Sequence, residues 1–133
     1  MATEVPIFLT LDEALALHSH QLQLYGGLRG VRDVGALKSA LAMPAARFDG
    51  NLLHATVFEQ AAAYLFHVAN KHPFIDGNKR TGLACALAFL RLNGWRVRAG
   101  EDEMVHFILD VAKGVASKSQ VAVWLQQHSV ESA

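Results

Sequence analysis

The chain has 133 residues, of which 52% are hydrophobic and 18% are charged, a composition that excludes intrinsic disorder and suits one compact domain. Twelve Lys and Arg residues balance twelve Asp and Glu residues, so no overall charge draws the protein to nucleic acid or to anionic lipid. The single cysteine excludes a disulfide framework and favours a reducing compartment. The first ten residues lack a signal peptide pattern, and no apolar run approaches the ~20 residues of a membrane span. We therefore expect a cytoplasmic protein with no direct nucleic acid partner and no membrane partner.

Helix signals dominate the first third of the chain. Thr10-Leu11-Asp12-Glu13 has the form of a capping box, and it predicts a helix that ends at Gly26-Gly27, where left-handed backbone costs little. Asp33 predicts the N-cap of a short second helix, which Pro44 closes.

The middle of the chain contains its most apolar segments. After a turn-like stretch at 48–51, apolar residues at helical spacing predict a third helix from about Leu53 to Asn70. A short polar loop follows, from His72 to Gly77. The next helix, from Asn78 to about Asn93, is apolar on nearly every side, so we expect it to be buried at the centre of the fold.

The last third is predicted to contain two more helices. Residues Trp95 to Arg98 alternate in polarity and form either one extended segment or a minor hairpin. Helices are predicted from about Asp102 to Ala112 and from about Gln120 to His128, the second after a capping signature at Ser117-Lys118-Ser119-Gln120. The predicted fold class is all-α, with six or seven helices and a buried central helix in one domain over residues 1–133.

The loop between the two most apolar helices contains the residues that point to chemistry, His72-Pro73-Phe74-Ile75-Asp76-Gly77-Asn78-Lys79-Arg80-Thr81. A helix start presents free amides and a partial positive charge, so Lys79 and Arg80 in its first turn are unfavourable unless an anion is bound. Gly77 allows the backbone to come close to a ligand, and the polyphosphate of a nucleotide is the obvious anion. Asp76 is a suitable ligand for Mg²⁺, and His72 is a natural general base for an incoming hydroxyl. Each feature alone is typical of an ordinary surface turn, and their combination favours an anion site.

Other candidate sites are weaker. His18 and His20 are two residues apart and point to different helix faces, and no His-Glu-x-x-His pattern occurs. Cys85, in an alanine-rich buried helix, is expected to be a core residue. The segment Gly26 to Gly30 lacks the spacing of a phosphate-binding loop and is interpreted as a connector. His18 is interpreted as a satisfied helix histidine rather than as part of a cleft.

The stretch from His72 to Arg80 resembles the signature of the Fic/Doc superfamily, H-x-F-x-[D/E]-[G/A]-N-[G/K]-R, which lies on a loop leading into a central helix. The matching residues are His72, Phe74, Asp76, Gly77, Asn78, Lys79 and Arg80. Lys79 stands where adenylylating members have glycine and points to the death-on-curing (Doc) branch, whereas Gly77 stands where the founding Doc-type motif has alanine. Segments 17–37 and 89–94 also resemble this branch, so the resemblance covers a core of about residues 8–128.

This resemblance implies a toxin that transfers the γ-phosphate of ATP to a threonine of elongation factor Tu and stops translation. His72 would be the catalytic base, and Asp76 would orient the substrate or bind Mg²⁺. Phe74 would pin the loop to the core. The residues that would hold the phosphates together with the loop amides are Gly77, Asn78, Lys79 and Arg80.

Two alternatives stay open, a Fic-type AMP transferase and a catalytically silent member that acts as a binding partner in a regulatory complex. Self-inhibited Fic relatives carry the pattern [S/T]-x-x-x-E-[G/N], and no Ser or Thr of this sequence begins such a pattern. The resemblance therefore implies an inhibitor in another chain. That inhibitor would be a small antitoxin of the Phd kind, whose disordered C-terminal segment folds into a helix along an apolar groove of the toxin.

Overall fold

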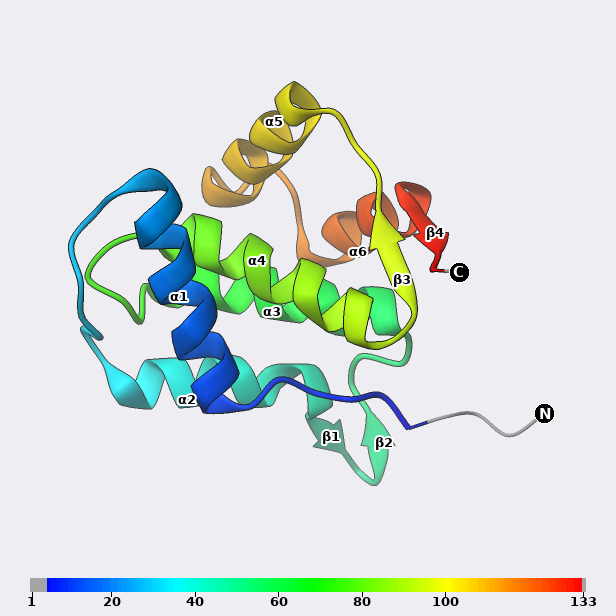
Figure 1. Ribbon diagram of the computed structural model, residues 1–133. Coiled ribbons are helices and arrows are strands. Elements are labelled where there is room, and N and C mark those ends of the chain that lie inside the picture. Colours follow the sequence, from blue (N-terminus) through cyan, green and yellow to red (C-terminus); the bar gives the residue numbers. More distant parts are fainter. Residues whose placement is uncertain (1–4, 133) are drawn as a thin grey trace.

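Six α-helices and one 3₁₀ turn make up most of the computed structural model, which describes residues 5–132 (Figure 1). The helices are α1 (Leu11–Tyr25), α2 (Val34–Ala42), α3 (Val57–Lys71), α4 (Asn78–Leu92), α5 (Glu101–Ala112) and α6 (Lys118–Gln127), with the 3₁₀ turn η1 at Met43–Ala45. The strands form two antiparallel pairs, β1 (Arg47–Phe48) with β2 (Asn51–Leu52) and β3 (Trp95–Val97) with β4 (Ser129–Glu131). The predicted all-α class is confirmed. Within residues 5–132, no helix has both the length and the apolar character needed to cross a bilayer.

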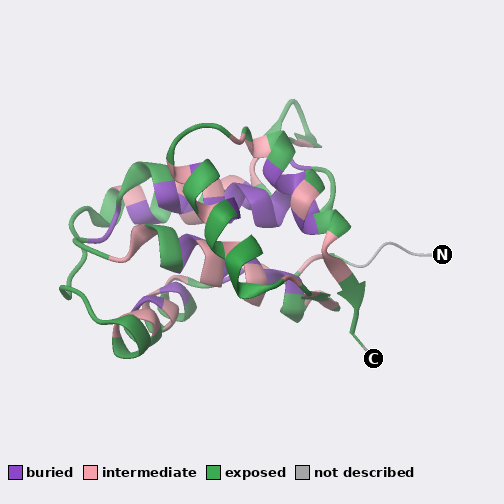
Figure 2. Ribbon diagram, turned by 90° about the horizontal axis from the view of Figure 1, so that it is seen from above, coloured by how far each residue is buried: buried purple, intermediate pink, exposed green. Residues whose placement is uncertain are grey.

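Helices α3 and α4 lie side by side at the centre, and the other helices surround them (Figure 1). Gly82 on α4 permits this close approach, because a Cβ there would lie 3.0 Å from the carbonyl oxygen of Leu65 on α3. Helix α3 buries more residues than any other described helix, whereas α4 buries one face and leaves Leu83 and Leu87 only partly covered. The expected central helix is therefore a pair, in which α3 is the more deeply buried. Figure 2 shows the buried residues concentrated in the middle of the molecule.

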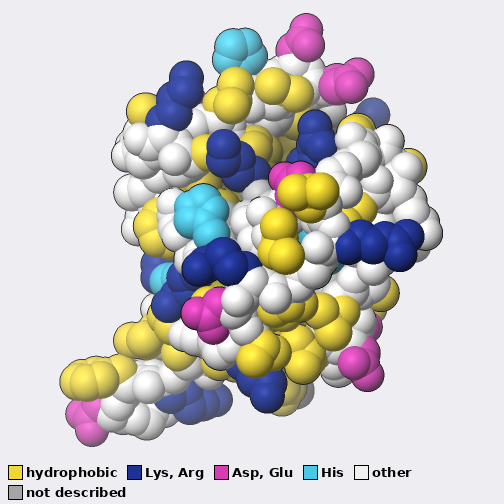
Figure 3. Space-filling view, turned by 90° about the vertical axis from the view of Figure 1, so that its left-hand side faces the viewer, with side chains coloured by type: hydrophobic (Ala, Val, Ile, Leu, Met, Phe, Trp, Pro, Cys, Tyr) yellow, Lys and Arg dark blue, Asp and Glu magenta, His cyan; other side chains and the backbone are white. Residues whose placement is uncertain are grey.

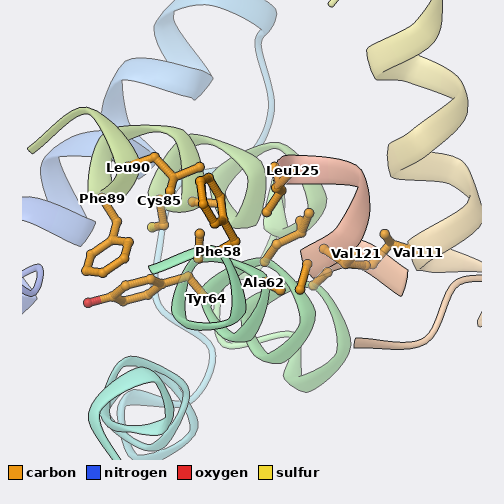
Figure 4. Packing of buried hydrophobic residues seen from close by; sticks show 14 of the residues in the cluster. Phe58, Ala62, Tyr64, Cys85, Phe89, Leu90, Val111, Val121 and Leu125 are labelled. Atoms are coloured by element: carbon orange, nitrogen blue, oxygen red, sulfur yellow. The ribbon is translucent and has the colours of Figure 1, made fainter. Parts of the chain in front are cut away.

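The main core is built around aromatic side chains (Figure 4). The rings of Tyr64 and Phe89 lie 5.2 Å apart, and Phe8 stacks on Phe89 at 5.5 Å. The Tyr64 hydroxyl accepts a 2.9 Å hydrogen bond from the backbone N–H of Leu9, which holds the N-terminal segment to the core. Cys85 is fully buried, and burial raises the pKa of its thiol to about 12. It is a core residue, as predicted.

Helix α3 begins later than the predicted start at Leu53. The Thr56 side chain accepts a hydrogen bond from the Glu59 amide and so caps the helix at that point. The β1–β2 pair, whose connecting Asp49 and Gly50 both adopt positive φ, ends at Leu52, and residues 53–56 between it and the helix are irregular. The cap at Thr56, rather than the apolar residues before it, therefore sets the start of α3.

The C-terminal part contains a strand pair that the sequence only half indicates. Residues 95–97 form an extended segment, the first of the two predicted alternatives, and not a local hairpin. This segment pairs with β4 near the end of the chain. Helix α6 begins before the predicted Gln120, because Ser117 and Gln120 themselves form the capping box that starts it.

Candidate active site

A cleft of about 900 Å³ opens between α1, the loop at 72–77 with the start of α4, and α5. The residues predicted for the site all line it, namely His72, Asp76, Gly77, Asn78, Lys79 and Arg80. Apolar side chains of α5 form the opposite wall, among them Met104, Ile108 and Leu109. Figure 3 views the molecule from the side of this loop and shows Lys and Arg side chains gathered there. The fold thus brings the predicted residues to one place, with a basic side and an apolar side.

Phe74 anchors the loop in the protein interior. Its side chain is 1% exposed and packs in a small cluster with Leu37, Ala40 and Val68. These residues come from α2 and α3, so the ring joins the loop to two helices at once. The Phe74 ring therefore lies where its predicted role as a structural pin requires.

His18 on α1 holds the same loop from its other side. Its ring stacks on Phe74 with centroids 3.8 Å apart and an interplanar angle of 6°. Its Nε2 donates a 2.8 Å hydrogen bond to the carbonyl oxygen of Asp76, and the residue is buried. His18 is a satisfied helix histidine, as interpreted, and it also supports the candidate site, a role that its local sequence could not reveal.

The Asp76 carboxylate is fixed by two backbone amides. Its Oδ2 accepts from the Leu28 N–H at 3.0 Å, and its Oδ1 accepts from the Gly77 N–H at 2.9 Å. The hydrogen bond from Leu28 has the largest effect on the pKa of Asp76 and lowers it below its usual value. The hydrogen bond from Gly77 and the charges of Arg80 and His18 lower it further. Gly27 makes room for this contact, because a Cβ at its φ of +126° would lie 2.8 Å from Asp76 Oδ2.

These hydrogen bonds predict a pH-dependent contribution of Asp76 to stability. Because the pKa in the folded state lies below the unfolded value of 3.8, the ionised carboxylate stabilises the fold above that value, and the stabilisation is lost as the pH falls through the folded pKa. We expect Asp76→Asn to lower the free energy of unfolding near neutral pH, with a difference from wild type that shrinks as the pH falls below about 4. Urea unfolding over a pH series measures it, with Asp110→Asn at an exposed position of α5 as the control. A difference that is constant with pH would contradict the assignment.

The start of α4 combines free backbone amides with two basic side chains. Gly77 adopts the left-handed conformation, with φ 76°, and the first bond of the helix runs from the Thr81 N–H to the Gly77 carbonyl at 2.9 Å. The preceding amides therefore have no partner within the helix. Lys79 and Arg80 line the cleft beside them, and the Arg80 guanidinium lies 4.5 Å from the centre of the Tyr25 ring. This arrangement suits phosphate oxygens.

The Asn78 side chain closes the loop. Its Oδ1 accepts from the Phe74 N–H at 2.8 Å, and its Nδ2 donates to the Phe74 carbonyl at 3.0 Å. The Asn78 side chain is therefore occupied within the loop, and a contact of Asn78 with phosphate stays a prediction for its backbone amide at the first position of α4.

The segment Gly26 to Gly30, interpreted as a connector, and the residues after it up to Asp33 support the loop at 72–77. The Ile75 N–H donates to the Gly30 carbonyl at 3.0 Å, and Val31 pairs with Phe74 as an isolated β-bridge. These contacts join residues about 40 positions apart, so no local pattern indicates them. The only signal was the run of glycines, several of which adopt positive φ.

The side chains in the cleft suit Mg²⁺ only if phosphate oxygens supply the other ligands. Within residues 5–132, no three His, Cys, Asp or Glu side chains come together to hold a metal ion. Mg²⁺ usually binds one or two carboxylates plus substrate phosphates, and Asp76 is an exposed carboxylate in the cleft next to the free amides at the start of α4. The residues present therefore fit the nucleotide directly and Mg²⁺ through a single carboxylate.

Comparison of the sequence with known proteins identifies a family and two relatives. The sequence model of a family described as "Fic/DOC family" matches residues 8–90. A protein named "Protein kinase doc", from Escherichia phage P1, is 37% identical over 116 residues, which is 87% of this chain and 90% of that protein. A protein named "Toxin Doc", from Mycolicibacterium smegmatis, is 41% identical over 78 residues, which is 59% of this chain and 60% of that protein. On this evidence the chain belongs to the Fic/Doc family.

Proposed function

We propose that this protein is a Doc-type toxin that transfers the γ-phosphate of ATP to a hydroxyl group of another protein. The observation that carries the proposal is the cleft itself, in which an exposed His72 faces the same space as the basic, amide-rich start of α4. The names of the two relatives, a kinase and a toxin, support the same activity.

In this proposal, each residue of the cleft has a separate role in the transfer. His72 accepts the proton of the substrate hydroxyl while the hydroxyl oxygen attacks the γ-phosphorus. The bond between the γ-phosphorus and the bridging oxygen breaks, and ADP leaves. Lys79, Arg80 and the first amides of α4 hold the phosphate oxygens and stabilise their charge. Mg²⁺, held by Asp76 and phosphate oxygens, would supply further neutralisation of that charge.

A protein is the favoured acceptor because apolar side chains surround the loop. Leu28, whose backbone N–H bonds to Asp76 of the loop, is 67% exposed. Ile75, within the loop itself, is 52% exposed. Exposed apolar groups next to a catalytic base are typical of a protein docking surface. With the resemblance to the Doc branch, we propose a threonine of a translation factor such as elongation factor Tu, in the cytoplasm, as the target.

The test uses purified protein, bacterial lysate and ATP radiolabelled at either the α- or the γ-phosphate. Transfer of the γ-label alone supports the proposal. Transfer of the α-label would instead identify an AMP transferase, the alternative that Gly77 of the motif favours. Transfer of neither label, with a protein that still folds, would leave the catalytically silent binding member as the remaining function.

Lys79 decides between these transfers in our proposal. Lys79→Gly removes a charge from the first turn of α4 and opens space in the cleft. We expect it to lower γ-phosphate transfer by about 10–100-fold and to admit some AMP transfer. The same two labels measure both rates. Lys79→Ala is the matched control, because it removes the charge and opens less space. Unchanged γ-transfer in both variants would show that Lys79 is only a solvated surface charge.

We also propose that an antitoxin of the Phd kind inhibits the protein in trans. The apolar wall of α5 supports this, because Val105 and Leu109 are 52% and 40% exposed on the side of the cleft. A disordered segment that folds into a helix gains its affinity from such apolar contact. Co-expression of a short neighbouring reading frame should restore growth that the toxin alone stops. Normal growth at high expression of the active toxin alone would refute this partner.

A further inference from the structure

The backbone of His72 is held in an unusual conformation. Helix α3 ends at this residue, which adopts the left-handed region with φ 50° and ψ 54°. Pro73 follows it, and a proline disfavours the right-handed helical conformation for the residue before it. Left-handed backbone is unfavourable for a residue with a Cβ, and it persists only where the surroundings hold it.

Arg32 makes the contacts that hold this turn. Its Nε donates to the His72 carbonyl oxygen at 2.7 Å, and its Nη2 donates to the Lys71 carbonyl oxygen at 3.0 Å. Its backbone N–H donates to the Pro73 carbonyl oxygen at 2.8 Å. One residue therefore binds three consecutive carbonyl groups where α3 ends and the loop begins. A guanidinium suits this place, since its planar fork reaches two acceptors and a cation is favourable at a helix C-terminus.

We propose that Arg32 is a positioning residue for the His72 base: it fixes the left-handed backbone at position 72 and thereby directs the imidazole into the cleft. The direction of a side chain from its Cα follows from the backbone torsions, so loss of the clamp lets the imidazole turn away from the reacting hydroxyl. This inference rests on the proposed function, in which His72 takes the proton.

A direct role of Arg32 in nucleotide binding is the competing explanation. Among the described residues, those that line the cleft do not include Arg32, whereas they do include Lys79 and Arg80. The Arg32 guanidinium also donates to backbone carbonyls from its Nε and Nη2. The positioning role therefore predicts an effect on kcat without an effect on the KM for ATP.

The kinetic test compares Arg32→Ala and Arg32→Lys with wild type. We expect kcat for γ-phosphate transfer to fall by about 10–100-fold in the alanine variant, the scale of a misplaced catalytic group, with the KM for ATP unchanged within about twofold. Lysine has a single donor group and reaches one carbonyl, so Arg32→Lys should be intermediate, and it replaces the alanine variant if that variant does not fold. Added methylguanidinium should restore part of kcat in Arg32→Ala.

Arg47→Ala is the matched control, because the Arg47 guanidinium also donates to a backbone carbonyl, that of Gly50 at 3.1 Å. This contact lies in the β1–β2 hairpin, before the start of α3, whereas His72 lies at its end. The control should keep its kcat. An unchanged kcat in Arg32→Ala, an equal loss in Arg47→Ala, or a loss confined to the KM for ATP would overturn the proposal.

An activity-independent measurement separates this inference from the proposed function. The ¹³Cα and ¹³C′ NMR chemical shifts of His72 report its backbone torsions in the free protein. We expect them to move in Arg32→Ala and to stay in place in Arg47→Ala. Shifts that do not move overturn the positioning role even if the wild type transfers phosphate. Shifts that move in a protein that transfers no phosphate support the clamp and refute only the proposed function.

Discussion

Replacing His72 with alanine is expected to lower the rate of γ-phosphate transfer by about 10²–10⁴-fold, the usual contribution of a general base. In the proposed function, the substitution removes the proton acceptor and leaves the phosphate contacts of α4 in place, so the loss should appear in kcat. The fold should be retained, because the His72 side chain is exposed whereas the anchors of the loop, Phe74 and His18, are buried.

The rate is measured with γ-labelled ATP at saturation, and retention of the fold is checked by thermal unfolding. His106→Ala, an exposed position on α5 that does not line the cleft, is the matched control. Transfer close to the wild-type rate in a well-expressed His72→Ala protein would exclude His72 as the base.

Phe74→Ala is expected to have the largest effect on stability, a loss of about 3–5 kcal/mol in the free energy of unfolding. The ring is 1% exposed, stacks on His18, and fills a cluster small enough that its neighbours cannot close the space it leaves. The loop should also become disordered in the folded molecule, so that transfer is lost together with stability.

Urea unfolding measures this loss, and Phe48→Ala in the β1–β2 hairpin is the control. Phe48 is 74% exposed, so its truncation should change stability by only about 0.5 kcal/mol. A loss below about 1 kcal/mol in Phe74→Ala would show that the ring does not pin the loop. Together with His72→Ala, the variant separates the chemistry of the loop from its anchoring.

The parts of the fold that could be predicted are those specified by neighbouring residues. The capping boxes at Thr10 and Ser117 are both present, and Asp33 caps α2 as expected. The candidate site was also readable from sequence, because its residues lie within one continuous stretch at the start of a helix. A helix start carries its own electrostatics, so the conflict of two cations with the dipole is visible without any tertiary structure.

The parts that could not be predicted depend on contacts between distant residues. Strand β4 exists because it pairs with β3, and the role of His18 depends on Phe74 and Asp76, more than 50 positions away. The apolar surface of α4 is a third example. It indicated a fully buried helix, whereas Leu83 on its outer face lines the cleft and is only partly covered. An apolar side chain at a binding cleft and one in a core have the same sequence signature.

The placement of Arg80 over Tyr25 has an entropic consequence. A free arginine side chain on a surface has roughly 2 kcal/mol of rotamer entropy to lose when it is immobilised by a ligand. Here the aromatic ring already confines the guanidinium, at 4.5 Å from its centre. Part of that ordering has therefore occurred during folding, so an anion that enters the cleft meets a preorganised cation. Preorganisation of this kind raises affinity without any additional contact.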